Sequence, residues 1–407
     1  MILTNDKWLR PRVLLLAVCL SGAVFSAAQT DYRTTEAKTL EHFNEKKWKA
    51  LTELGENALE YGLDYYALRY RLGVAAFEQK TYWRSTRHFE KALHFNSADS
   101  VSQEYLYYAY LFSGREDEAV FLSKNFSESL REKLNITPVK AIDWVYAEAG
   151  KKLSTVPDSV GDMTFTSLWL GHRLGYRWQL TQAFSFLQLP VKTQDFNQYE
   201  YYLRSKYRLS SSFSTVAVLH YAFAKGTTQA EQSESRLEES DWIVQLGVEK
   251  RYGQVTVAPY LAHIATNVSQ APAEPLQYSV SSWQGGVEVS VVPPLRRSPL
   301  YLNVGASVHV SGNDTHLLWN LSARWQIAPK IAVQMSYLKS GASYFLEENG
   351  ALFNNAISVT ESRLSALLSY RVAPHVVLFS AWQKEKKKDE HIDFFYTTFL
   401  LGLKSQL

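Results

Sequence analysis

The sequence has almost no cysteine: Cys19 is the only one among 407 residues. A chain cleaved after Cys19 could form no disulfide, which excludes a disulfide-stapled secreted fold. Charge of one sign is also scarce, because the formal net charge is +3, so we expect no nucleic-acid partner. Beyond the first thirty residues no segment reaches the roughly 18 consecutive apolar residues that indicate a membrane-spanning helix.

Aromatic side chains, in contrast, are abundant. They make up 14% of the chain, with 25 Tyr and 11 Trp. Tyr and Trp combine an apolar ring with a polar atom and gather where apolar and aqueous surroundings meet. The composition therefore favours a protein that exposes rings at an interface.

The N-terminus is typical of an export signal. Three basic residues, Lys7, Arg10 and Arg12, precede the 13-residue apolar run VLLLAVCLSGAVF, and small residues follow. This order matches a secretory signal peptide, and we expect a signal over residues 1–28, cleaved near Ala28–Gln29. The alternative is a lipoprotein signal that ends at Cys19, in LAVC. Either signal predicts the bacterial envelope as the destination.

Residues from about 30 to 135 follow a helical period and repeat every 34 residues. Units of this length are helix–turn–helix pairs that bury their apolar faces only against neighbouring units. The segment 66–99, YALRYRLGVAAFEQKTYWRSTRHFEKALHFNSAD, fits best. The signature positions are Leu72, Gly73, Phe89 and Ala92, with Leu106, Tyr110 and Ala119 one period later and Ala58 and Leu59 one period earlier.

In these positions the segment resembles the tetratricopeptide (TPR) family, and the resemblance implies a concave protein-binding groove. The alternative is a helical spacer or plug. The cluster Tyr105, Tyr107, Tyr108 and Tyr110 is a candidate lining of the groove, and packing between helices is the competing interpretation.

Near residue 140 the hydrophobic period changes from 3.6 to 2 and keeps that value to the end. In YLNVGASVHV, residues 301–310, apolar side chains alternate strictly with polar or small ones. The pattern predicts fourteen strands: about 141–151, 162–173, 176–189, 198–209, 212–225, 240–251, 254–266, 277–291, 299–311, 315–327, 330–343, 357–372, 375–386 and 391–404.

Three features favour a transmembrane antiparallel β-barrel over a soluble sandwich. The strands are longer than the roughly 5–6 residues of average globular strands. Tight connections alternate with long polar ones, expected at 225–240, 341–356 and 385–391, the last being EKKKDEH. Aromatic residues on the apolar parity form a predicted girdle near strand ends: Tyr176, Trp178, Trp242, Trp325, Tyr337 and Tyr370.

In a membrane barrel the apolar parity faces lipid and the other parity faces a polar lumen. In the stretch 317–327 the apolar row would therefore meet outer-membrane lipid. Charged residues on the lumen parity could form a constriction or a gate held by Arg–Glu pairs, or a satisfied polar filling. The candidates are Arg204, Arg208, Glu249, Glu288, Arg324, Arg363 and Arg371.

One pair of residues could carry chemistry. His309 and Ser311 lie two residues apart in a predicted strand, which can bring a base within reach of a hydroxyl. Their spacing resembles the His-x-Ser pair of outer-membrane phospholipases, although Gly312 and Asn313 reverse the Asn-Gly order that follows in that family. We therefore expect no enzyme, no catalytic residue, no metal and no cofactor.

The whole layout resembles the surface-lipoprotein assembly modulators, the exopolysaccharide export porins and the YaiO-like barrels. The sequence thus predicts a signal peptide (1–28), a periplasmic TPR-like helical domain (29–138) and an outer-membrane β-barrel (139–407). The predicted function is a channel or export component whose helical domain recruits a periplasmic or exported protein. The alternative is a non-transporting scaffold or a lipid-modifying barrel that uses His309 and Ser311.

Overall fold

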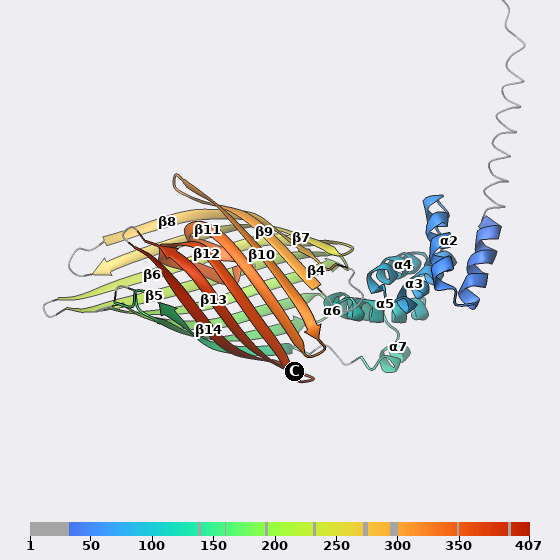
Figure 1. The fold of residues 1–407 in the computed structure, drawn as a ribbon, viewed down its shortest axis with the longest axis horizontal. Coiled ribbons are helices and arrows are strands. Elements are labelled where there is room, and N and C mark those ends of the chain that lie inside the picture. Colours follow the sequence, from blue (N-terminus) through green and yellow to red (C-terminus); the bar gives the residue numbers. More distant parts are fainter. Residues whose placement is uncertain are drawn as a thin grey trace, which may run out of the picture. The chain divides into compact units, whose positions relative to one another are not determined.

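The chain forms two compact units, which divide between Ile136 and Thr137. The computed structural model (Figure 1) describes residues 32–136, 140–158, 160–191, 194–230, 233–271, 276–293, 300–347, 350–389 and 392–407. The predicted signal peptide and Cys19 lie outside the described residues. Within them, no helix has the length and apolar character needed to cross a membrane.

The first unit is helical, and its helices begin at intervals of 34 residues. Residues 32–44 are helical. α2, α4 and α6 start at Trp48, Tyr82 and Glu116, and α3 and α5 start at Tyr66 and Ser100. The helices are α2 (Trp48–Glu60), α3 (Tyr66–Glu78), α4 (Tyr82–Phe95), α5 (Ser100–Phe112), α6 (Glu116–Ser123) and α7 (Glu128–Lys133).

The turns between these helices repeat with the same spacing. Lys46, Lys80 and Gly114 each adopt a positive φ, of 55°, 58° and 71°, and each ends the first helix of a helix pair. Left-handed residues satisfy the last carbonyls of a helix and reverse the chain. The 34-residue sequence repeat is therefore a repeat of structure.

Close packing between paired helices explains the small residue at Gly73. A Cβ atom there would lie 2.8 Å from the ring of Phe89, so only glycine lets α3 approach α4 this closely. Phe89 is fully buried with Val74, Leu106 and Tyr110. The signature positions Phe89, Leu106, Tyr110 and Ala119 thus form a core between the second and third helix pairs, whereas Ala58 and Leu72 belong to a second cluster between the first and second pairs.

The second unit is a closed barrel of fourteen antiparallel strands (Figure 1). Each strand pairs with its sequence neighbours, and β1 pairs with β14 to close the barrel. The strands are β1 (Ile142–Ser154), β2 (Met163–Leu174), β3 (Trp178–Val191), β4 (Gln194–Ser210), β5 (Phe213–Ala230), β6 (Ser233–Tyr252), β7 (Val255–Ala271), β8 (Leu276–Val291), β9 (Leu300–Ser311), β10 (Asp314–Ala328), β11 (Ile331–Glu347), β12 (Leu352–Ala373), β13 (Val376–Lys388) and β14 (Asp393–Gln406). The predicted number of strands is confirmed.

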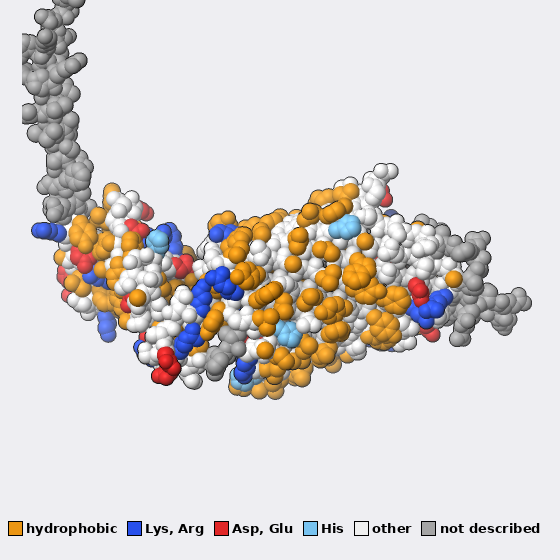
Figure 2. Space-filling model, turned by 180° about the vertical axis from the view of Figure 1, so that it is seen from behind, with side chains coloured by type: hydrophobic (Ala, Val, Ile, Leu, Met, Phe, Trp, Pro, Cys, Tyr) orange, Lys and Arg blue, Asp and Glu red, His pale blue; other side chains and the backbone are white. Residues whose placement is uncertain are grey.

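The alternation in the sequence separates the two faces of the barrel wall. In β10, Leu317, Leu321 and Trp325 are 66%, 47% and 50% exposed on the outside, whereas Leu318 on the opposite parity is buried. Figure 2 shows hydrophobic side chains over the middle of the outer surface, with Lys and Arg side chains toward its ends. The predicted girdle residues Trp178, Trp242 and Tyr370 belong to this exposed surface.

Two of the predicted long loops are largely strand. β5 and β6 extend to Ala230 and Ser233, so most of 225–240 is a long hairpin, paired from Lys225↔Glu238 to Ala230↔Ser233. β13 extends to Lys388 and includes most of the predicted loop 385–391. The loop predictions were wrong because polar residues continue both strand pairs beyond the apolar band, and in β13 the alternate residues Glu385 and Lys387 are buried inside the barrel.

The barrel has two distinct ends. At the turn end lie the tight connections that contain Gly175, Gly253 and Ala328, together with the start of β1 and the end of β14. At the opposite end, here called the loop end, β11 and β12 are joined. The prediction of a long loop at 341–356 was wrong in a different way, because β11 continues to Glu347, β12 begins at Leu352 and the described residues between the two strands fold into the barrel.

Candidate functional site: the barrel lumen

A hairpin at the end of β11 and β12 leaves the barrel wall and occupies the lumen. The two strands pair regularly up to Lys339↔Ser362, a first register shift follows before Ala342↔Thr360, and the next paired residues are Tyr344 and Asn355. Between these last two pairs β11 contributes one residue and β12 contributes four, so the ladder must bend. Thr360 still pairs with Lys387 of β13. We call residues 343–347 and 350–354 the lumenal hairpin.

The lumenal hairpin packs against the opposite wall through apolar side chains. Leu346 and Phe353 belong to one buried cluster with Ala222 of β5, Ile243 of β6 and Ala262 and Ile264 of β7. These wall residues are small or branched and point inward. The cluster is an apolar contact between the hairpin and the barrel wall.

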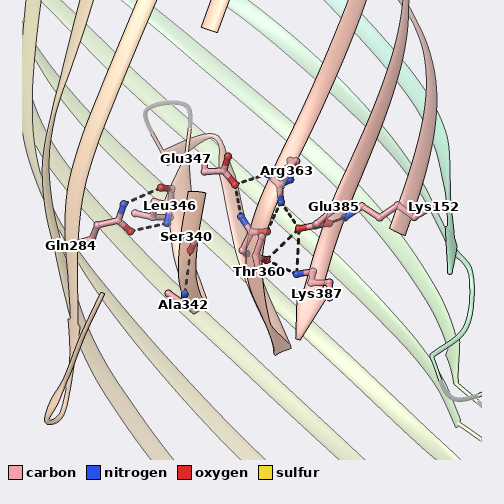
Figure 3. A network of polar contacts seen from close by, with 11 residues as sticks. Lys152, Gln284, Ser340, Ala342, Leu346, Glu347, Thr360, Arg363, Glu385 and Lys387 are labelled. Atoms are coloured by element: carbon pink, nitrogen blue, oxygen red, sulfur yellow. Dashed lines mark hydrogen bonds and ion pairs between the residues drawn. The ribbon is translucent and has the colours of Figure 1, made fainter. Parts of the chain in front are cut away.

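Polar side chains of the wall hold the hairpin backbone. The Gln284 side chain of β8 accepts a hydrogen bond from Leu346 N (2.8 Å) and donates one to Leu346 O (2.9 Å) (Figure 3). His220 Nδ1 of β5 lies 3.1 Å from Gly350 O, and a carbonyl can only accept, so this nitrogen carries the proton. The side chains thus replace the backbone ladder that the hairpin has lost.

Gly350 at the tip of the hairpin needs its small size. Its φ is +77°, and a Cβ atom would lie 2.9 Å from Gln245 Oε1 and 3.2 Å from Val218 Cγ1. Both the backbone conformation and the close approach to β5 and β6 require glycine. The tip therefore lies directly against the wall.

A cluster of charged side chains joins the base of the hairpin to the adjacent wall (Figure 3). Arg363 Nη1 donates to Glu347 Oε1 (2.5 Å), while Nη2 donates to Asn354 Oδ1 and to Glu385 Oε1 (both 2.8 Å). Glu347 and Asn354 belong to the hairpin, whereas Glu385 belongs to β13. Arg363 therefore bridges the hairpin and the wall.

Two lysines complete this cluster from β13 and β1. Lys387 Nζ donates to Thr360 Oγ1 (2.6 Å) and lies 3.4 Å from Glu385 Oε1, and Lys152 Nζ lies 3.4 Å from Glu385 Oε2. Glu385 and Lys387 are 0% and 3% exposed. Removal of one partner from such a buried network leaves an uncompensated charge and destabilises strongly.

The sequence prediction missed most of this cluster. It placed Arg363 on the lumen face but interpreted the run EKKKDEH as a solvated loop. In β13 the run alternates, so Glu385 and Lys387 face the lumen at buried positions while Lys384 has its ring contact with Phe395. Because both parities of the run are charged, hydrophobic period gives no signal there.

Two other predicted lumen residues form an ion cluster on the wall. Glu249 of β6 accepts a hydrogen bond from Arg204 of β4 (2.6 Å) and is also paired with Lys206. Arg208 is buried and donates to Ser211 O (3.2 Å). These groups lie toward the turn end and compensate one another within the wall.

The remaining predicted lumen residues are dispersed. Glu288 and Glu347 both border a small cavity of about 10 Å³ between β8, β9 and β10. Arg324 and Arg371 are exposed near the turn end. The structure thus brings Arg204 and Glu249 together and places Arg363 in a separate cluster, rather than forming one ring of charge.

Two cavities remain in the lumen beside the hairpin. One of about 400 Å³ extends toward the loop end, where Leu237 and Asp389 line it. The other, of about 520 Å³, extends toward the turn end, where Trp144 and Lys404 line it. The residues lining both are Lys152, Leu187, Glu200, Phe353 and Asn354. The cavities therefore adjoin along the edge of the lumenal hairpin.

His309 and Ser311 are not assembled as a base and a nucleophile. His309 is 3% exposed and its Nδ1 has no hydrogen-bond partner in the described structure. Its Cα partner is His316, whereas Ser311 ends β9 and pairs with Asp314. Among the described residues, no group of three or more His, Cys, Asp or Glu side chains could hold a metal ion.

The tyrosines of the predicted groove lie on α5 of the helical unit. Tyr110 is buried, donates to Glu90 Oε1 (2.8 Å) and lies under the guanidinium of Arg115. Tyr105 stacks on Phe89 with ring centroids 5.3 Å apart. Tyr107 and Tyr108 are partly exposed and contact each other edge to face. Tyr105 is also partly exposed, so three of the four tyrosines keep some free surface and Tyr110 belongs to the core.

Comparison with known proteins found similarity to solved structures alone. No family model matches it, and no curated protein matches it. The monoaromatic hydrocarbon channel CymD shares 9% identity, covers 72% of this chain and 92% of its own, and has a TM-score of 0.43. The toluene transporter TodX of Pseudomonas putida shares 5% identity, covers 67% and 90%, and has a TM-score of 0.41.

A third similar structure is CdiB from Acinetobacter baumannii, with 9% identity, coverage of 66% of this chain and 61% of its own, and a TM-score of 0.43. Similarity at this level does not define a substrate. The chain is a fourteen-stranded antiparallel β-barrel with an N-terminal helical unit, and its function must be argued from its own lumen.

Proposed function

We propose that the chain is an outer-membrane channel and that solutes pass through the two cavities beside the lumenal hairpin. The observation that carries this proposal is the closed barrel with an exposed apolar outside and a lumen, lined by both polar and apolar side chains, that is only partly filled. An apolar exterior around a closed ladder is suited to lipid, where no strand edge can remain unpaired.

The hairpin also has a structural reason to occupy the lumen, which is the width of the barrel. A barrel of fourteen strands is wider than the eight-stranded barrels that side chains can fill. Without the hairpin, most of the lumen would be water-filled. The hairpin thus narrows the path to the side lined by β1–β4 and β12–β14, where Ser167 and Ser185 face the larger cavity.

Conductance in planar lipid bilayers tests the channel. Purified full-length protein is expected to give single-channel steps, and Ser185→Trp should reduce their size because the indole enters the larger cavity. Ser380→Trp on β13 is the matched control, since Ser380 is exposed and has the parity of the outward Leu378. The absence of steps from every form, or equal steps from both variants, would contradict the proposal.

We further propose that the helical unit is a TPR-like periplasmic module that recruits a partner protein. Support comes from helices that start at 34-residue intervals and from the partly exposed Tyr107 and Tyr108. A pull-down from periplasmic extract with the full chain and with residues 140–407 should recover a protein only with the full chain. Equal recovery by both would refute recruitment by this unit.

The non-transporting alternative predicts different results. A scaffold gives no conductance in any form. A lipid-modifying barrel releases fatty acid from phospholipid vesicles and loses this activity in His309→Ala. The lipid-modifying barrel is not supported, because His309 Nδ1 has no hydrogen-bond partner in the described structure.

A further inference from the structure

We propose that the lumenal hairpin is a gate: it releases β5–β8 and moves toward the loop end, which joins the two cavities into one wider path. This inference rests on the proposed channel function. It follows from how the hairpin is held, from what lies behind it and from the charges at its base.

The wall behind the hairpin is complete without it. β5 and β6 pair without a break from Phe213↔Lys250 to Ala230↔Ser233, and β7 and β8 pair from Val255↔Val291 to Gln270↔Leu276. Release of the hairpin therefore breaks no strand ladder in this wall. Opening removes the apolar contacts of Leu346, Phe353 and Ala351 and the hydrogen bonds from wall side chains to the hairpin backbone. It also removes the hydrogen bonds from Arg363 to Glu347 and Asn354 at the base of the hairpin.

The base of the hairpin has the geometry of a hinge. Between Ala342↔Thr360 and Tyr344↔Asn355 the strands are out of register by several residues, so no regular ladder stiffens this point. Below it, β11 and β12 pair continuously with each other from Ile331↔Tyr370 to Lys339↔Ser362. The ladder break thus separates a firm wall from a hairpin that can turn as one piece.

The charged cluster allows this motion without stranding a buried charge. Arg363 and Glu385 both stay on the wall and remain paired (2.8 Å) when the hairpin leaves. Glu347 would move with the hairpin toward water at the loop end. The Arg363–Glu347 contact is thus a latch that can open, whereas the Arg363–Glu385 contact is permanent.

Gln284 provides the most direct variant for a test. Gln284→Ala removes both hydrogen bonds to Leu346, and two bonds of ordinary strength should shift the ratio of open to closed hairpin by about tenfold. Ser307→Ala is the matched control, because Ser307 Oγ bonds to Gln284 Nε2 (3.1 Å) but belongs to the wall. Open probability in bilayers should rise in Gln284→Ala and stay unchanged in Ser307→Ala.

A cross-link tests the same motion by holding the hairpin against the wall. Ala351 of the hairpin packs against the cluster that contains Val218 of β5. The double variant Ala351→Cys with Val218→Cys, made with Cys19→Ser so that no other thiol is present, can be joined by a short bifunctional thiol reagent. The joined form should lose the open state and regain it after reduction. Ala351→Cys alone should not respond to the reagent.

A second readout separates failure of the gate from failure of the channel. Ser167→Cys, placed in the larger cavity and made with Cys19→Ser, should react with a bulky external maleimide faster when Gln284→Ala is added. Conducting protein whose joined and reduced forms have equal conductance, and whose Ser167→Cys labelling is equal with and without Gln284→Ala, would overturn the gate and leave the channel intact. Protein that never conducts but is labelled faster with Gln284→Ala would overturn the channel and leave the moving hairpin.

Discussion

A single arginine placed at two heights on one strand tests whether the outer face of the barrel meets lipid. Leu321 lies at the middle of β10, and Ile327 lies six residues further along the same face. They are 47% and 49% exposed, so their surroundings within the protein are matched. A difference between Leu321→Arg and Ile327→Arg would therefore report the surrounding solvent rather than the packing.

The expected difference follows from strand geometry. Six residues at about 3.3 Å each span about 20 Å along the strand, which is about 15 Å along the barrel axis at a tilt of about 40°. The apolar band of such barrels is about 25 Å tall, so a side chain 15 Å from its middle has left it. Leu321→Arg should lower the free energy of unfolding by about 2–4 kcal/mol, and Ile327→Arg by about 0–1 kcal/mol.

The measurement is reversible urea unfolding of the protein inserted in lipid vesicles, followed by tryptophan fluorescence. Each variant is compared with the unmodified chain at the same lipid ratio. If both arginines lower the free energy of unfolding equally, or if Leu321→Arg has no effect, the outer face meets water and the membrane argument fails.

Two further predictions concern charged pairs inside each unit. Arg363→Met should lower the free energy of unfolding of the barrel by about 3–5 kcal/mol, because Glu347 and Glu385 lose their shared partner; adding Glu347→Gln should restore part of it in the same urea assay, since Glu385 keeps Lys387 and Lys152. In the helical unit, the hydrogen-bonded Arg71 guanidinium holds the pKa of the Glu36 carboxyl below its ordinary value of 4.5. The ionised pair therefore stabilises the unit above pH 4.5 and this contribution is lost as the pH falls through the lower folded-state pKa; melting by circular dichroism should show this loss, and Arg71→Met should remove it.

The barrel could be predicted from the sequence because apolar and polar residues alternate along its strands with a period of two. In β9 and β10 most inward residues are small or polar, Leu318 being an exception, and most outward ones are apolar, so the period of two gives the strand, its faces and its length together. The helical unit was predicted from its 34-residue repeat. Within one repeat Gly73 lets α3 approach Phe89 of α4 closely.

The position of the lumenal hairpin could not be predicted because its partners are distant in sequence. Half of residues 343–354 are apolar, which is unusual for an external loop, but their position is set by Gln284, His220 and Gln245 on three distant strands. The same holds for the cluster around Arg363. Lys152 and Glu385 are joined across 233 positions of sequence, a distance over which a single sequence without pairing information carries no signal.

The pairing of β1 with β14 has a consequence for the synthesis of this protein. It runs from Trp144↔Gln406 to Ser154↔Tyr396, so the first-made and the last-made strands of the sheet must find each other. A ribosome that stops short, or a frameshift near the end of the gene, yields a sheet with two bare edges. Such a product differs from the complete protein, because its unpaired strand edges can pair with strands of other chains. Closure of the barrel therefore requires both β1 and β14.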